Sequence, residues 1–149
     1  MKSNLNHQSN DSNCKGVEIL SIGSELLLGN IVNTNAQWIS EELSTLGLNH
    51  FRQSTIGDNS ERIIKLIKEI SSRSNLLITT GGLGPTPDDL TTESIAKSFN
   101  ASLSEREYLW DQIKKKLSIS GSSFNKSSLK KQCFFPKDCL LYTSPSPRD

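Results

Sequence analysis

Short apolar runs alternate along the chain with segments in which apolar residues recur every three or four positions. The runs Val17–Ile22 (VEILSI) and Leu76–Thr80 (LLITT) predict buried strands, and His50–Ile56 is a weaker strand candidate. Helical spacing predicts four helices, at residues 35–46, 60–70, 92–99 and from 104 onward. This alternation predicts a three-layer α/β fold, in which a mainly parallel sheet carries helices on both faces.

Residues with a preference for helix ends support these boundaries. Gly47 stands where a left-handed residue is needed to stop the first helix. Asp58 with Glu61 has the spacing of a capping box for the second helix, and Ser104 with Glu107 has that spacing for the fourth.

The composition is that of one globular domain, since 34% of the 149 residues are hydrophobic and 22% are charged. Residues 1–15 are rich in Asn and Ser and are expected to form a disordered tail. No apolar secretory segment follows the start, and no stretch approaches the length of a membrane span. We therefore expect a cytoplasmic protein with no membrane partner.

Charge and cysteine content exclude two further classes of site. A net charge of +1 gives no electrostatic footprint for nucleic acid, and Lys114–Lys116 is interpreted as a solvated helix face because no aromatic residues are interleaved. The three cysteines form no Cys-x-x-Cys pair and lie far from both histidines. A zinc site is therefore not expected, and the cysteines are interpreted as free thiols in a reducing compartment.

The most informative stretch is GGLGPTPDDLTTE, at residues 81–93, directly after a predicted strand. In parallel sheets, ligands bind beyond the carboxyl ends of the strands. Gly81, Gly82 and Gly84 leave no side chain between the backbone N–H groups and a ligand, and a helix N-terminus follows. The pattern is neither a Walker A sequence nor a Rossmann fingerprint. It predicts a phosphate-binding loop, and hence a small phosphorylated ligand.

Carboxylates in and near this loop suggest a cation. The loop contains Asp88 and Asp89 but no Lys or Arg, so a divalent metal such as Mg²⁺ would relieve their repulsion of a phosphate. The alternative for Asp89 is a simple N-cap of the third helix. Asp58 has the same two interpretations, as a cap of the second helix or as a site residue whose strand end lies beside Gly84 in the sheet.

The loop after the first strand begins Gly23-Ser24-Glu25. A Glu directly after a strand-ending glycine points to the site, and the alternative is the start of a surface helix. Asn33, Thr34 and Asn35 could cap a helix or bind a ligand, and capping is the favoured interpretation.

Three motifs in order resemble the N-terminal domain of the CinA family. They are GSELLLGNIVNTNAQ at residues 23–37, IGDN at 56–59 and TTGGLGPTPDDLT at 79–91, and the resemblance covers about Val17 to Pro136. The family belongs to the molybdopterin-binding fold, which includes molybdopterin adenylyltransferases. Two acidic residues of those enzymes fall on Asp58 and Asp89.

The resemblance implies a metal-dependent hydrolase of ADP-ribose-type pyrophosphates. Gly23, Ser24, Gly81, Gly82 and Gly84 would bind the ligand. Asp58 and Asp89 would hold Mg²⁺, Mn²⁺ or Co²⁺ and act in catalysis, with Asp88 and Glu25 in support. The alternatives are a molybdopterin-binding or adenylyl-transferring protein of molybdenum-cofactor synthesis, or a non-catalytic binding module. Relatives suggest a homodimer or homotrimer.

The last residues depart from the family pattern. Residues 16–138 are expected to form the domain, whereas 139–149 (CLLYTSPSPRD) match nothing in the family and are expected to be a non-native tail. The family's next site-closing segment would then be missing, so weak activity is expected of this chain.

Overall fold

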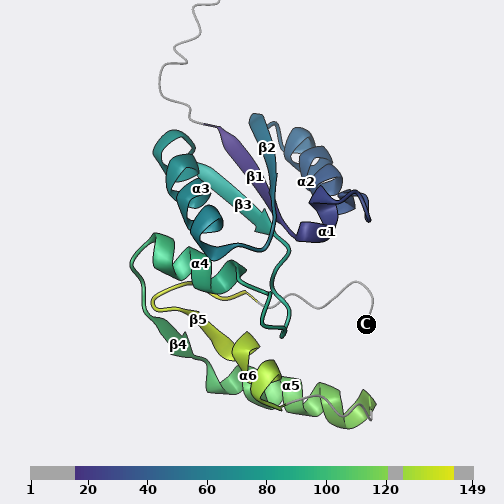
Figure 1. Ribbon diagram of the computed structural model, residues 1–149, viewed down its shortest axis with the longest axis vertical. Coiled ribbons are helices and arrows are strands. Elements are labelled where there is room, and N and C mark those ends of the chain that lie inside the picture. The colour runs from purple at the N-terminus through teal and green to yellow at the C-terminus, as the bar shows by residue number, and fades with distance from the viewer. Residues whose placement is uncertain (1–15, 121–125, 143–149) are drawn as a thin grey trace, which may run out of the picture.

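The computed structural model describes residues 16–120 and 126–142 (Figure 1). The expected disordered tail, residues 1–15, lies outside these ranges. Three parallel strands form the main sheet in the order β2-β1-β3, with β1 at Val17–Ile22, β2 at His50–Ile56 and β3 at Leu76–Thr80. All three strands were predicted from the sequence at these bounds.

Strand β1 forms the centre of the core because it is buried on both faces. All six of its residues are buried, and alternate side chains point to opposite faces of a sheet. Leu20 and Ile22 pack with the Ile63, Ile67 and Ile70 side chains of helix α3.

The odd-numbered residues of β1 face the other layer. Val17 and Ile19 pack with Ala36 and Leu43 of helix α2. Helix α2 spans Thr34–Thr45 and α3 spans Ser60–Arg73, and Figure 1 shows them on opposite sides of the sheet. The predicted three-layer α/β fold is thus confirmed.

The rest of the chain extends this core from the α3 side. Helix α4 packs against α3 and starts at the end of the glycine-rich loop (Figure 1). A two-stranded antiparallel sheet, β4 with β5, follows. The remaining bounds are Thr91–Ser98 for α4, Leu103–Glu105 for β4, Glu107–Ser120 for α5, Lys126–Lys130 for α6, Lys131–Cys133 for the 3₁₀ turn η1 and Phe134–Pro136 for β5.

Two of the predicted helix ends differ from the structure. Helix α3 is capped by Asn59, whose side chain accepts a hydrogen bond from the N–H of Arg62 at 3.0 Å, and not by Asp58. Ser104 lies within β4, so it does not cap the helix that begins at Glu107. Both errors arise because the capping-box spacing can also occur one residue before the true cap or within a strand. Gly47, with a φ of +69°, follows the end of α2 as predicted.

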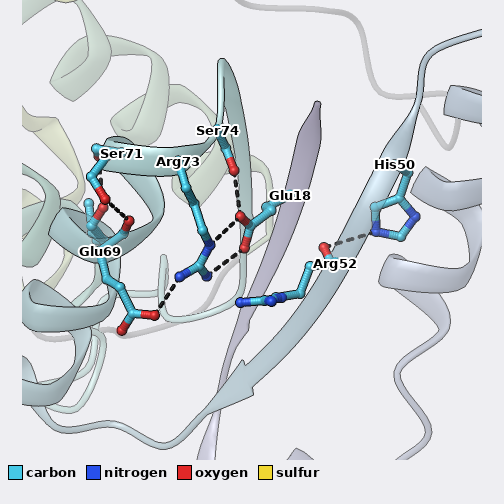
Figure 2. A network of polar contacts seen from close by, with 9 residues as sticks. Glu18, His50, Arg52, Glu69, Ser71, Arg73 and Ser74 are labelled. Carbon is cyan, nitrogen blue, oxygen red and sulfur yellow. Dashed lines mark hydrogen bonds and ion pairs between the residues drawn. The ribbon is translucent and has the colours of Figure 1, made fainter. Parts of the chain in front are cut away.

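A buried ion pair stabilises the amino end of the sheet, opposite the end at which the glycine-rich loop leaves β3 (Figure 2). Glu18 of β1 is only 3% exposed, and Arg73 at the end of α3 donates to both of its carboxylate oxygens at 2.7 and 2.8 Å. The hydroxyl of Ser74 also donates to Glu18, and Arg73 forms a second pair with Glu69. The hydrogen bond from Arg73 holds the pKa of Glu18 below its usual value against the opposing effect of burial.

Two observations bear on the surface and the thiols. Within the described ranges, no helix combines the length and the apolar character that crossing a bilayer requires. Cys133 and Cys139 are free thiols, and burial raises the pKa of Cys133.

Candidate functional site

The glycine-rich loop leaves β3 with an unusual backbone that only glycine adopts readily. Gly81 has a φ of +89° and Gly82 a φ of +59°. A Cβ on Gly81 would overlap the carbonyl oxygen of Ile22 at the end of β1, and one on Gly82 would overlap the hydroxyl of Thr91. These two glycines are therefore required first by the packing of the loop against the strand and helix that flank it.

Thr91, the first residue of α4, holds the carbonyl side of the loop. Its buried hydroxyl donates to the Gly81 carbonyl at 2.7 Å, and its N–H donates to the Gly82 carbonyl at 3.2 Å. Within the part of the chain that the structure describes, the N–H groups of Gly82 and Leu83 donate no hydrogen bond. These two amides are available to an anionic ligand.

Asp89 closes the loop on itself. Its Oδ2 accepts hydrogen bonds from the N–H of Thr86 at 2.8 Å and from the Thr86 hydroxyl at 2.5 Å. Helix α4 is preceded by Leu90 and has no side-chain cap, so the interpretation of Asp89 as an N-cap is wrong. Gly84 leaves room for the carboxylate, because a Cβ there would lie 2.7 Å from Oδ2. Asp88 is exposed.

The environment keeps Asp89 ionised. Burial raises the pKa of its carboxyl, but hydrogen bonds from Thr86 and from the N–H of Gly84, together with the charge of Lys131, outweigh burial. The pKa therefore lies below the usual value, and the side chain is a carboxylate at neutral pH. It can act as an oxygen ligand to a cation.

A basic residue that the sequence did not indicate lies against the loop. The ammonium group of Lys131, in η1, donates to the Asp89 carbonyl at 2.7 Å and to the Thr86 carbonyl at 3.1 Å, and it lies 3.6 Å from a carboxylate oxygen of Glu93. Gln132 donates to the Leu83 carbonyl at 3.1 Å. The loop sequence itself contains no Lys or Arg. The fold nevertheless brings the ammonium group of Lys131 to the loop from 42 residues beyond Asp89.

A cavity of about 380 Å³ opens between the loop, α4 and the segment from Ser127 to Phe134. Leu83, Leu103 and Phe134 give it an apolar wall, and Glu93, Lys131 and Gln132 line it with polar groups. Its volume is within the range of small-molecule sites, and its mix of apolar walls with a few polar groups is typical of them.

Asp58 joins the loop after β2 to the loop after β1. Its Oδ2 accepts from the N–H of Ser24 at 2.8 Å, and the Ser24 hydroxyl accepts from the N–H of Asp58 at 3.2 Å. Asp58 thus accepts a hydrogen bond from the first backbone N–H of the short helix α1, which spans Ser24–Leu27. Gly23 donates to the Ile56 carbonyl at 2.9 Å. The exposed Glu25 folds its carboxylate over Gly23, where a Cβ would lie 2.5 Å from Oε1.

The expectation that the strand end of Asp58 lies beside Gly84 is wrong. Strand β1 lies between β2 and β3, so the two loops are two strand spacings, roughly 10 Å, apart. The described residues contain no group of three or more His, Cys, Asp or Glu side chains that could hold a metal. A cation therefore fits here only together with a ligand, in the way that Mg²⁺ combines one or two carboxylates with substrate phosphates.

The fold and this loop define a molybdopterin-binding type of domain. The chain belongs to the family described as probable molybdopterin binding domain, whose sequence model matches residues 18–136. Among curated proteins, it is 89% identical over 145 residues to a CinA-like protein of Prochlorococcus marinus subsp. pastoris, and 52% identical over 131 residues to one of a Synechococcus species. These alignments cover 97% and 88% of this chain but only 34% and 31% of the relatives.

Solved structures agree with this assignment. The CinA protein of Thermoplasma acidophilum, described as of unknown function, matches with a TM-score of 0.79 and 32% identity over 91% of this chain and 78% of that one. The tungsten cofactor synthesizing protein MoaB of Pyrococcus furiosus matches with a TM-score of 0.51 and 26% identity over 72% and 68% of the two chains. The resemblance to the CinA N-terminal domain is confirmed, and the chain spans about a third of the length of its curated relatives.

Proposed function

We propose that this CinA-like domain binds the diphosphate of a nucleotide at the backbone amides of Gly82 and Leu83 and cleaves ADP-ribose-type pyrophosphates with the help of a divalent metal. One observation carries the proposal. The N–H groups of Gly82 and Leu83 have no partner within the described residues, and both residues line the 380 Å³ cavity. Free backbone amides beside a helix N-terminus form an anion-binding site.

The charges around the loop support a role for a metal ion. A diphosphate at these amides would lie close to the ionised Asp89, and Glu93 lines the same cavity. Lys131 compensates only part of this negative charge because its ammonium already bonds two loop carbonyls. Asp89 would hold Mg²⁺, Mn²⁺ or Co²⁺ together with phosphate oxygens, whereas Asp58, on the far side of β1, is bound to Ser24 and lies too far away to share the ion. Such an ion supplies Lewis-acid stabilisation of the charge that develops on the phosphoanhydride.

The chain's own residues orient this site. Thr86 and Gly84 fix the Asp89 carboxylate, Thr91 turns the loop carbonyls away from the ligand, and Lys131 ties the loop to η1. Preorganised groups of this kind lower the cost of reorganisation in the transition state.

A second candidate is a pterin-binding protein of molybdenum-cofactor synthesis. The family description and the MoaB neighbour favour it, and the apolar wall formed by Leu83, Leu103 and Phe134 suits a flat heterocycle. The two candidates use the same loop and differ in what occupies the cavity.

The test is AMP release from ADP-ribose in the presence of Mg²⁺, Mn²⁺ or Co²⁺, with a chelator as control. We expect metal-dependent release that Asp89→Asn lowers at least tenfold, because a hydrogen bond or ligand bond to a charged group contributes that much or more. Asp111→Asn, on the exposed face of α5, removes the same charge far from the loop and should leave the rate unchanged. Asp89→Asn should cost about 1 kcal/mol of stability, since Asn keeps one acceptor oxygen for the two Thr86 donors and loses the second oxygen and the charge.

Two results together would contradict the proposed hydrolase. Absence of metal-dependent release, together with a pterin that copurifies with the protein, would reject the hydrolase and favour the cofactor-synthesis candidate.

A further inference from the structure

Lys131 and Asp89 hold the same turn of the glycine-rich loop, at residues 86–89, from two sides. The Asp89 carboxylate accepts hydrogen bonds from the N–H and the hydroxyl of Thr86, and the N–H of Asp89 donates to the Thr86 carbonyl at 3.1 Å. The ammonium group of Lys131 bonds the carbonyls of the first and last residues of this turn, Thr86 and Asp89. One cation from a distant part of the chain therefore holds both ends of the turn that carries the Asp89 side chain.

The donors of Lys131 are already used in this arrangement. An ammonium group has three N–H donors. Two of them bond the loop carbonyls at 2.7 and 3.1 Å, and the ammonium also lies 3.6 Å from the Glu93 carboxylate, which belongs to α4. A phosphate in the cavity would have to displace one of these partners to gain a direct bond from Lys131. The contacts are thus those of a residue that shapes the loop.

The neighbouring Lys130 provides a comparison within the same chain. It lines the same cavity, but its ammonium pairs with Glu105 of β4 at 3.0 Å. The two lysines carry the same charge beside the same cavity, and Lys131 bonds the loop. Electrostatic attraction of an anion would use both lysines, whereas orientation of Asp89 would use Lys131 alone.

We propose that Lys131 is a positioning residue, which fixes the turn at residues 86–89 and, through it, the orientation in which the Asp89 carboxylate meets a metal ion. The part that concerns the metal rests on the proposed function, whereas the hold on the turn is a property of the chain alone. Lys131 acts through Asp89 and bonds neither the metal nor the phosphates. Glu93 keeps the ammonium group in place from the side of α4.

The first measurement needs neither metal nor nucleotide. In the ¹⁵N-labelled chain, the Thr86 amide proton reports its bond to Asp89, because a hydrogen bond to a charged oxygen shifts an amide proton downfield. Asp89→Ala removes the acceptor and defines complete loss of this bond. Lys131→Met should move the Thr86 resonance upfield by at least half of that difference, and Lys130→Met should leave it in place. The amide of Ile67, in the core beside α3, should stay unmoved in every variant and shows that each is folded.

The second measurement is the dissociation constant of the Mn²⁺–ADP complex, determined by water proton relaxation. Lys131→Met should raise this constant about tenfold, because a misplaced Asp89 loses a bond to a charged ligand that contributes that much. Lys130→Met should keep it within twofold. Lys131 is partly exposed and Met has a similar length, so the Lys131→Met chain is expected to fold.

The failures of the two proposals are distinguishable. An unmoved Thr86 resonance in Lys131→Met would overturn the positioning role, whatever the metal does. Equal weakening of Mn²⁺–ADP binding in the two lysine variants would also overturn it, because charge alone would then explain the effect. A moved resonance with unchanged Mn²⁺–ADP binding would overturn the link to the metal. Absence of Mn²⁺–ADP binding by the wild-type chain would overturn the proposed function, while the Thr86 resonance would still decide whether Lys131 holds the turn.

Discussion

Gly81→Ala is expected to lower the free energy of unfolding by about 3 kcal/mol. The substitution forces a residue with a side chain into the left-handed region, at a φ of +89°, which costs about 1–2 kcal/mol. It also places a Cβ against the carbonyl oxygen of Ile22, in the backbone of the central strand, where relief of the overlap costs roughly another 1–3 kcal/mol. Urea denaturation measures the loss.

Gly29→Ala is the matched control. Gly29 also has a positive φ, of +72°, but a Cβ there would meet nothing within 4 Å. Its replacement should therefore cost only the conformational term, about 1 kcal/mol. Equal losses in the two variants would show that the loop does not pack against β1 as closely as described.

Arg73→Met is expected to lower the free energy of unfolding by about 3 kcal/mol. The variant leaves Glu18 as a buried carboxylate without its bidentate partner, and breaking a buried pair from one side costs several kcal/mol. The double variant Glu18→Met with Arg73→Met removes both charges and should recover most of the loss. A double variant as unstable as Arg73→Met would contradict this account of the pair.

The same pair predicts a dependence of stability on pH. The pKa of Glu18 is lower in the folded protein than its unfolded value of about 4.3, so the carboxylate's contribution is fully present above that value. The contribution is lost as the pH falls through the folded pKa. Denaturation between pH 7 and pH 3 should show this loss in the wild type, and the double variant should lack it.

The strands and the glycine-rich loop could be predicted because local sequence determines them. β1 is buried on both faces, so VEILSI reads as a nearly continuous apolar run despite Glu18, and Gly81 follows LLITT directly. The placing of a phosphate loop at the end of β3 needed only these patterns and the general rule for parallel sheets.

The partners of polar side chains could not be predicted in the same way. Asp58, Asp89 and Asn35 were each given a cap as an interpretation, yet they bind Ser24, Thr86 and Thr80 respectively. A cap is a local choice, whereas the contacts of Asp58 and Asn35 join parts of the chain that are 34 and 45 residues apart and meet only once the strand order is set. Lys131 reaches the loop only because η1 folds against it, and its position in a Lys-rich stretch carries no such signal.

The central claim is that the backbone amides of Gly82 and Leu83 bind the phosphates. NMR titration of the ¹⁵N-labelled chain with ADP-ribose and Mg²⁺ tests it most directly. We expect saturable downfield shifts of the Gly82 and Leu83 amide protons, because each gains a hydrogen bond to a charged oxygen, while the Gly29 and Gly47 amides stay in place. Saturable binding that leaves the Gly82 and Leu83 resonances unmoved would contradict the account.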